Sequence, residues 1–181
     1  METFVSMLRG INVSGQKKVS MEELKKSCES MGFRKVRTYI QSGNVIFEDS
    51  GEDIEALADR IRGTIEDHFG FEVAIVIRTG NELQEVIANL PFTKQDRSKL
   101  HVTFLSAKPS TVPTGEIDSA REGGEEFSIA GREIYLFCPN GYGRTKLTNT
   151  FFERKLKVSA TTRSWRTVDA LCSMANGRIS S

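Results

Sequence analysis

The chain has 181 residues and a net charge of +1, with 38% apolar and 27% charged residues, as is ordinary for a globular protein. Its 15 glycines and 4 prolines exclude a collagen-like or low-complexity chain, and no apolar run reaches the roughly 18 residues that a membrane span needs. The 3 cysteines are too few for a disulfide framework and favour a reducing, cytoplasmic location.

The near-neutral total hides a strong segregation of charge along the chain. Residues 8–47 carry +5, residues 48–72 carry −7 and residues 140–181 carry +6. Near neutrality argues against a dedicated duplex-DNA binder, but two basic segments that meet in space would attract an anion. Solvated helix faces produce the same pattern, so the charge alone leaves both interpretations open.

The first part of the chain is predicted to alternate strands and helices. A capping box at 20–23 begins a helix that Gly32 ends, and Ser50 or Asp49 is expected to cap a second helix that ends at Gly70. Its apolar stripe includes Ile61. The predicted strands and helices, in order, are strand 3–9, helix 21–31, strands 36–40 and 45–48, helix 54–69 and strand 71–78.

The same order of elements is predicted to recur, after a short helix over 83–90 and a polar stretch over 91–98. It consists of strand 100–106, a weak helix 116–122, a hairpin of 126–129 with 133–137, helix 147–156, strand 159–162 and a last helix from Trp165 that Gly177 stops. The predicted fold class is α+β, with two consecutive ferredoxin-like (βαββαβ) units and mostly antiparallel sheets. The predicted domains are 1–79 and 99–181, joined by a helical link and loop at 80–98.

Four polar stretches stand apart from these patterns: RGINV at 9–13, TYIQSGN at 38–44, PNGYGRTKLTN at 139–149 and ATTRSW at 160–165. Together, and in this order, they resemble the bacterial family catalogued as domain of unknown function 1697, over the whole chain. The chain departs from the family pattern at Ser14 and Ser164, where Gly and Asn are usual. The resemblance implies no established activity.

The stretch at 141–149 has the features of an anion site. Glycines follow a strand and precede a helix, so free backbone N–H groups and the positive end of the helix dipole attract phosphate or carboxylate. Arg144 and Lys146 add positive charge. The spacing of glycine and lysine excludes a P-loop. The alternative is a tight turn that carries two surface cations.

The remaining stretches have both a structural and a functional interpretation. Ser164 is a plausible helix cap, and Trp165 either stacks on a base or packs in the core. Gln41 and Asn44 either form a turn or recognise a base or sugar through their amides. The connection from Gly10 to Ser20 is long and basic, which is typical of a binding loop or lid.

Few residues point to catalysis. His68 and His101 have no Cys or Asp partner at a catalytic spacing, and the three cysteines fit apolar faces, so packing is the expected role of all five. No metal-binding or nucleophile motif occurs, and we expect neither a metal nor another cofactor. Because no general base can be named, enzymatic activity is left open.

The sequence predicts a binding module for an anionic, phosphorylated ligand, either a nucleotide or single-stranded nucleic acid, with no membrane partner. A metal-independent enzyme for an anionic small molecule is one alternative, and a protein-interaction or structural role is another. Arg9 and Arg144 are expected on one side of the molecule. The predicted ligand-binding residues are Arg9, Asn12, Tyr39, Gln41, Ser42, Asn44, Tyr142, Arg144, Lys146, Asn149, Arg163 and Trp165.

Overall fold

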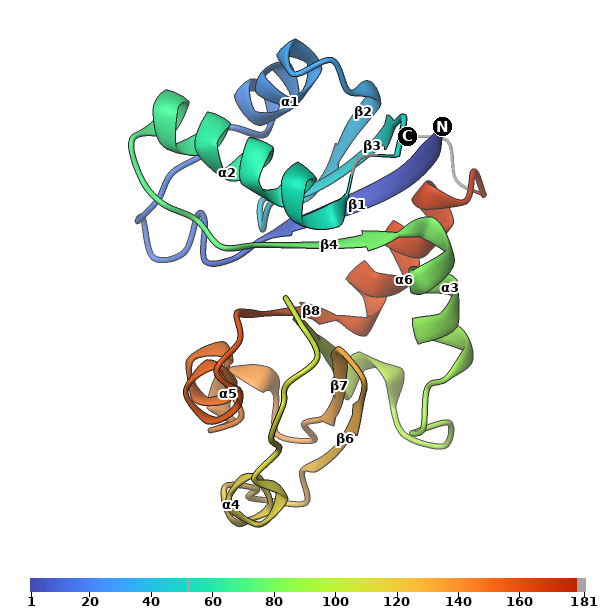
Figure 1. Cartoon of the computed structure of the whole chain (residues 1–181). Coiled ribbons are helices and arrows are strands. Elements are labelled where there is room, and N and C mark those ends of the chain that lie inside the picture. Colours follow the sequence, from blue (N-terminus) through green and yellow to red (C-terminus); the bar gives the residue numbers. More distant parts are fainter. Residues whose placement is uncertain (52, 179–181) are drawn as a thin grey trace. The chain divides into compact units, whose positions relative to one another are not determined.

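The computed structural model of the chain describes residues 1–51 and 53–178 (Figure 1). The chain forms two compact units: unit 1 is Met1–Glu85 with the chain from Ala170 on, and unit 2 is Val86–Asp169. The unit boundaries fall inside two helices, α3 (Gly80–Ala88) and α6 (Trp165–Ala175). Whether residues 80–98 act as a link between domains stays a prediction.

The sheet of unit 1 contains β1 (Glu2–Leu8), β2 (Arg34–Tyr39), β3 (Asn44–Asp49) and β4 (Ile75–Thr79). Their order is β2-β3-β1-β4, and every neighbouring pair is antiparallel. The predicted hairpin of the second and third strands is confirmed, with Tyr39 opposite Asn44. The fourth strand begins at Ile75 instead of at 71. Its pairing with β1 starts there, with Ile75 opposite Leu8.

Helices α1 (Met21–Ser30) and α2 (Ile54–Phe69) cover one face of this sheet (Figure 1). Ser20 caps α1 as predicted, because its hydroxyl accepts from the N–H of Glu23. Asp53 caps α2 in place of the expected Ser50 or Asp49, with its carboxylate accepting from the N–H groups of residues 55 and 56. The apolar stripe of α2, formed by Leu57, Ile61 and Ile65, packs into the core of unit 1. Phe4, Leu24 and Phe47 belong to the same core.

Unit 2 has a second antiparallel sheet of four strands, β5 (Leu100–Leu105), β6 (Glu126–Ala130), β7 (Glu133–Phe137) and β8 (Ala160–Ser164). Their order is β6-β7-β5-β8, which repeats the order of the first sheet with four added to each number. The two orders are therefore compatible with two repeated units, as an α+β chain with duplicated element order predicts.

Two helices that lie wholly within unit 2 pack against the apolar core of that unit. They are α4 (Thr114–Ser119) and α5 (Asn149–Leu156), and short 3-10 turns occupy Arg97–Lys99 and Tyr142–Arg144. Helix α5 begins at Asn149 rather than at 147 because the Thr148 hydroxyl accepts from the N–H of Phe151 and caps it. The core of the unit contains Leu105, Ile117, Ile134, Phe152 and Leu156.

Equivalent positions of the two sheets carry similar residues. Arg78 in β4 lies opposite Val5, and Arg163 in β8 lies opposite Val102, and both arginines are buried. The next residue in each strand caps a helix, because the hydroxyls of Thr79 and Ser164 accept from backbone N–H groups three residues on. Ser164 therefore has the capping role that the sequence predicts. Over residues 1–51 and 53–178, no helix combines the length and the apolar character that crossing a bilayer requires.

Candidate functional site

The predicted ligand-binding residues divide equally between the two units. Unit 1 holds Arg9, Asn12, Tyr39, Gln41, Ser42 and Asn44, and unit 2 holds Tyr142, Arg144, Lys146, Asn149, Arg163 and Trp165. Within unit 1, all six residues lie in two segments, 9–19 after β1 and 39–44 around the β2–β3 turn. We call these two segments the loop pair.

Hydrogen bonds hold the loop pair together. The Asn12 Nδ2 atom donates to the backbone oxygen of Gln41 at 2.8 Å, and the N–H of Leu8 donates to the backbone oxygen of Gly43 at 2.9 Å. Gly43 lies so close to Ile11 that a Cβ atom there would be 2.5 Å from Cδ1 of Ile11. The two segments therefore form one local structure, and whether that structure binds a ligand stays a prediction.

The side-chain amides of the loop pair serve its own backbone. Asn12 also donates to the oxygen of Val19 and accepts from the N–H of the same residue, at 3.0 and 2.8 Å. Asn44 is fully buried, and its Nδ2 atom donates to the backbone oxygen of Tyr39 and to the Ser42 hydroxyl. Both asparagines thus shape the loop pair, whereas Gln41 is exposed.

Backbone strain is concentrated in the loop pair. Among the described residues, six other than glycine have a positive φ, and four of these are Asn12, Ser14, Lys17 and Ile40. A β-branched residue such as Ile40 rarely adopts φ near its value of 49°. Strained residues cost free energy and persist where the surrounding structure enforces them, often at binding sites.

The exposed surface of the loop pair is basic and carries two apolar tips. Segments 9–19 and 39–44 contain Arg9, Lys17 and Lys18 and no Asp or Glu. The Lys17 ammonium donates to the backbone oxygen of Glu72 at 2.9 Å, so its charge is not neutralised by this contact. Val13 and Ile40 are 58% and 49% exposed. This surface has the composition to attract an anion and to contact an apolar group beside it.

In unit 2, Tyr142 packs against a histidine. The rings of Tyr142 and His101 stack with centroids 4.9 Å apart and an interplanar angle of 23°. Burial lowers the pKa of His101 from its usual 6.5, and the nearby Lys99 carbonyl opposes part of this shift. Its buried Nδ1 atom has no hydrogen-bond partner among the described residues. The ring is therefore held neutral near pH 7.

Arg163 and Asn149 belong to hydrogen-bond groups around β8. Arg163 donates to the Thr161 hydroxyl and to the Thr162 carbonyl, at 2.7 and 3.1 Å. Burial lowers the pKa of Arg163 to about 10, and an electrostatic interaction with Tyr142 opposes this shift. The Thr162 hydroxyl donates to Oδ1 of Asn149 at 2.6 Å. Tyr142 and Arg163 are thus brought together in this unit, with Asn149 tied to the adjacent strand residue.

The other three predicted residues of unit 2 differ in their surroundings. Lys146 forms an ion pair with Glu122, which raises the pKa of the lysine. Trp165 is only 5% exposed, so its indole packs rather than offering a face for stacking. Arg144 is exposed in the turn at Tyr142–Arg144. Of these three, Arg144 has the charge most available to a ligand.

The structure provides little for nucleophilic or metal-based chemistry. Burial raises the pKa of Cys28 to about 12 and that of Cys138 to about 11, so both thiols are protonated at neutral pH. Among the described residues, no group of three or more His, Cys, Asp or Glu side chains is placed to hold a metal ion. What the two regions offer chemically is cationic and hydrogen-bonding groups for an anion.

Sequence reasoning gave His101 a packing role and passed over Val13 and Ile40. The stacking partner of His101 lies 41 residues away in the chain, so no local pattern could indicate it. The sequence predicts Ile40 as the last residue of strand 36–40, whereas β2 ends at Tyr39 and Ile40 is exposed. The one available signal was its place before the turn-forming Gln41-Ser42-Gly43-Asn44, where the chain must reverse.

Comparisons with known proteins place the chain among relatives without an assigned activity. The family model described as "Protein of unknown function (DUF1697)" matches residues 1–135. A solved structure, the conserved bacterial protein SP0830 from Streptococcus pneumoniae, covers 96% of this chain and 98% of its own length, with 23% identity and a TM-score of 0.74. That likeness shows a shared fold. No curated protein matches the chain.

Proposed function

The chain belongs to the DUF1697 family of proteins of unknown function, and we propose that it is a binding module for an anionic ligand that carries phosphate, either a nucleotide or a single-stranded nucleic acid. The observation that carries the proposal is the loop pair of unit 1. It contains four residues with a strained backbone and no Asp or Glu, and it carries three cations.

Charge supplies the first supporting argument. Lys17 and Lys18 are both exposed, and Arg9 is half-buried at the start of the same loop. Phosphate contacts from such cations release counterions, so they contribute affinity that does not depend on base sequence. The exposed Gln41 amide of the same loop pair can donate to or accept from a base or sugar.

The apolar tips supply the second argument. Val13 and Ile40 are two of the three large apolar side chains that are most exposed among the described residues. They belong to the same two segments that carry the three cations, and a base offers an apolar face beside a charged phosphate. The local chemistry therefore fits a nucleotide unit better than a bare inorganic anion.

We also infer that each unit is ferredoxin-like and that the two arose as repeats. The strand order β2-β3-β1-β4 with helices after the first and third strands fits that description, and β6-β7-β5-β8 fits it equally. A cytoplasmic location is part of the same proposal. The three free cysteines, all buried, are consistent with a reducing compartment.

A fluorescence-anisotropy titration of the full chain tests the proposed function. One arm uses a short labelled single-stranded oligonucleotide, and the other uses a labelled nucleoside triphosphate, so that the two ligand classes are distinguished. We expect saturable binding in at least one arm, with affinity that falls as salt rises. For a single strand, each phosphate contact contributes about −0.7 to the slope of log affinity against log salt.

Two paired variants locate the binding surface. Lys17→Ala with Lys18→Ala is expected to weaken binding and to reduce the salt slope by roughly 1.4 if both lysines contact phosphate. The control is Lys25→Ala with Lys26→Ala, which removes the same charge from α1, where these lysines pair with Glu29 and Glu22. Equal losses in both pairs, or no binding in either arm, would contradict the proposal.

Arg144 of unit 2 is a separate candidate contact, tested independently of the loop pair. Arg144→Ala should lower the affinity while leaving the melting temperature unchanged, because the side chain is exposed. Lys146 and Trp165 are left out, since one pairs with Glu122 and the other is buried. An affinity identical to that of the unmodified chain would show that Arg144 does not contact the ligand.

A further inference from the structure

Unit 2 contains a surface cavity that none of the predicted site residues lines. It lies between the segment leading into α4 and the C-terminal turn of α5, and its volume is about 440 Å³. Pockets for small ligands commonly measure about 300–1,000 Å³. The cavity is therefore of a size that accepts a small molecule.

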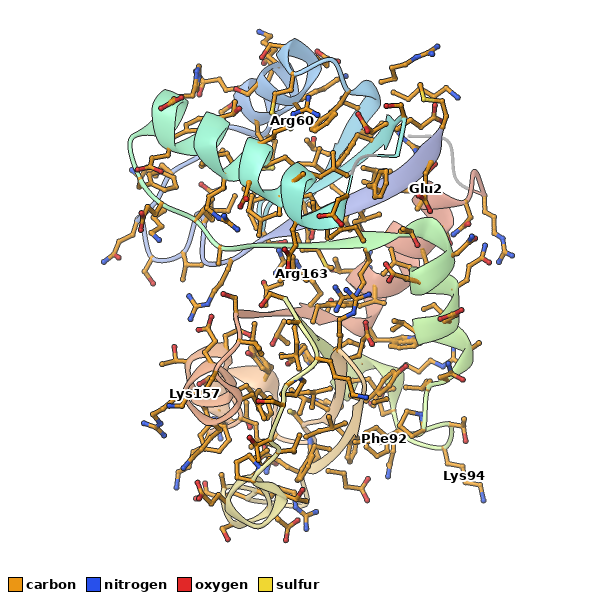
Figure 2. All side chains as sticks on the ribbon, in the orientation of Figure 1. Glu2, Arg60, Phe92, Lys94, Lys157 and Arg163 are labelled. Carbon is orange, nitrogen blue, oxygen red and sulfur yellow. The ribbon has the colours of Figure 1, made fainter. Side chains whose placement is uncertain are left out.

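Its lining combines charge with an apolar floor. Arg154, Lys155 and Lys157 come from the end of α5, and Val112 and Pro113 come from the segment before α4. Figure 2 shows Lys157 beside α5, where its side chain is exposed. A ligand with an anionic group and a small hydrocarbon part would match both halves of this lining.

An ion pair joins the two sides of the cavity. Lys155 pairs with Glu116 of α4, which lowers the pKa of that carboxyl, so the pair is charged on both sides and contributes no net charge. Arg154 and Lys157 then leave a local charge of +2 in the lining. Glu116 is held by Lys155 and does not cancel them.

Lys157 occupies a position where lysine is unusual. It is the C-terminal cap of α5 with φ 60°, and its N–H donates to the oxygen of Glu153 at 2.9 Å. Glycine is the favoured residue at such left-handed caps, since other residues adopt this conformation at a cost. Helix-dipole stabilisation is a reason for cations in the last turn, but it does not require one at this strained cap.

From the cavity, its charge and this cap, we propose that the groove between α4 and α5 binds a small organic anion. Arg154 and Lys157 contact the phosphate or carboxylate group, and Val112 and Pro113 contact the hydrocarbon part. This site is in unit 2 and does not rest on the function proposed for the loop pair.

The test is a titration of the full chain with phenyl phosphate, monitored by two-dimensional amide NMR. Inorganic phosphate and benzoate are the comparison probes. We expect saturable shifts at 111–117 and 154–158. Phenyl phosphate should bind more tightly than inorganic phosphate, on the order of tenfold, because its ring covers the apolar floor. Comparing benzoate with phenyl phosphate separates a carboxylate site from a phosphate site.

Three variants decide the assignment. Arg154→Gln with Lys157→Gln should weaken binding roughly tenfold or more. Lys157→Gly removes one cation at a position that suits glycine, so it should keep the melting temperature of the full chain and still weaken binding. Lys25→Gln with Lys26→Gln is the control for loss of charge, and it should leave the affinity unchanged.

Other outcomes overturn the proposal. Shifts confined to residues outside the groove, no saturable binding by any probe, or equal weakening in the control would each do so. If Lys17→Ala with Lys18→Ala abolishes phenyl phosphate binding while Arg154→Gln with Lys157→Gln does not, the probe binds the loop pair. In that case the groove proposal fails and the proposed function of the loop pair remains.

Discussion

His101 gives the chain a predictable response to acid. Burial lowers the pKa of this ring in the folded state, whereas the unfolded chain has the ordinary value near 6.5. Above pH 6.5 the imidazole is neutral in both states and adds no pH dependence. As the pH falls below that value, the unfolded chain binds a proton first, and stability declines until the folded-state pKa is reached.

The variant His101→Phe keeps a ring against Tyr142 and cannot titrate. Between about pH 7 and pH 5, a range that spans the ordinary histidine pKa, its free energy of unfolding should therefore fall less than that of the unmodified chain. Urea denaturation at a series of pH values measures the difference. Identical pH profiles for the two proteins would show that His101 is not held neutral by the fold.

Gly43 tests the packing of the loop pair. It has φ +83°, and an added Cβ would lie 2.5 Å from Cδ1 of Ile11 and 3.0 Å from Cβ of Leu8. Gly15 has a similar φ of +74° with nothing within 4 Å, so it is the matched control for backbone strain alone. We expect Gly15→Ala to cost about 1 kcal/mol and Gly43→Ala about 2–3 kcal/mol of unfolding free energy. Equal costs would mean that the two segments do not pack closely.

At the scale of single elements, α2 shows how well a stripe of apolar residues predicts a core. Ile61 is fully buried, as its place in the stripe predicted. Ile61→Ala should cost about 2–5 kcal/mol, because it removes buried methyl groups and leaves a cavity. Glu66→Ala, on the exposed side of the same helix, should change stability by at most about 0.5 kcal/mol. Thermal and urea melts of both variants check the contrast.

Element starts were predictable where one residue had both the cap chemistry and the right spacing. Ser20 satisfies both conditions at the start of α1. Ser164, the last residue of β8, satisfies them at the start of α6. Before α2, three residues that can cap a helix compete, namely Asp49, Ser50 and Asp53. Only the structure shows that Asp53 accepts the N–H groups of residues 55 and 56. Helix α5 likewise begins at Asn149 instead of at 147, because the Thr148 hydroxyl accepts from the N–H of Phe151.

The site was harder to predict than the elements. The sequence showed that Asn12, Gln41 and Asn44 lie in turns, but it could not show that two of these amides bind backbone groups far along the chain or across a turn. It also could not show the stack of His101 on Tyr142. Such contacts join segments that no periodic pattern relates. They depend on the pairing register of the strands, which the sequence alone does not determine.

At the scale of the whole molecule, unit 1 needs the end of α6. Arg37 of β2 donates to the Met174 oxygen at 2.8 Å, and the Asn176 amide donates to the Gly80 oxygen at 3.2 Å. Met174 and Ala175 are buried. A fragment that stops at Glu85 loses these contacts, so we expect it to melt at a lower temperature than the full chain, and less cooperatively.

Joining the segment from Ala170 on to that fragment through a flexible linker should restore much of the loss. Circular dichroism melts of the two fragments provide the comparison. A fragment ending at Glu85 that melts as cooperatively as the full chain would show that the segment from Ala170 on is dispensable, and it would favour the domain boundary predicted near residue 79.

The central claim is that the loop pair binds a phosphate-bearing ligand, and amide NMR of the full chain with a short single-stranded oligonucleotide tests it most directly. The account predicts saturable shifts concentrated at 9–19 and 39–44, which disappear as salt is raised. It also predicts that Lys17→Ala with Lys18→Ala removes them. Shifts confined to other parts of the chain, or shifts in the loop pair that salt does not change, would contradict it.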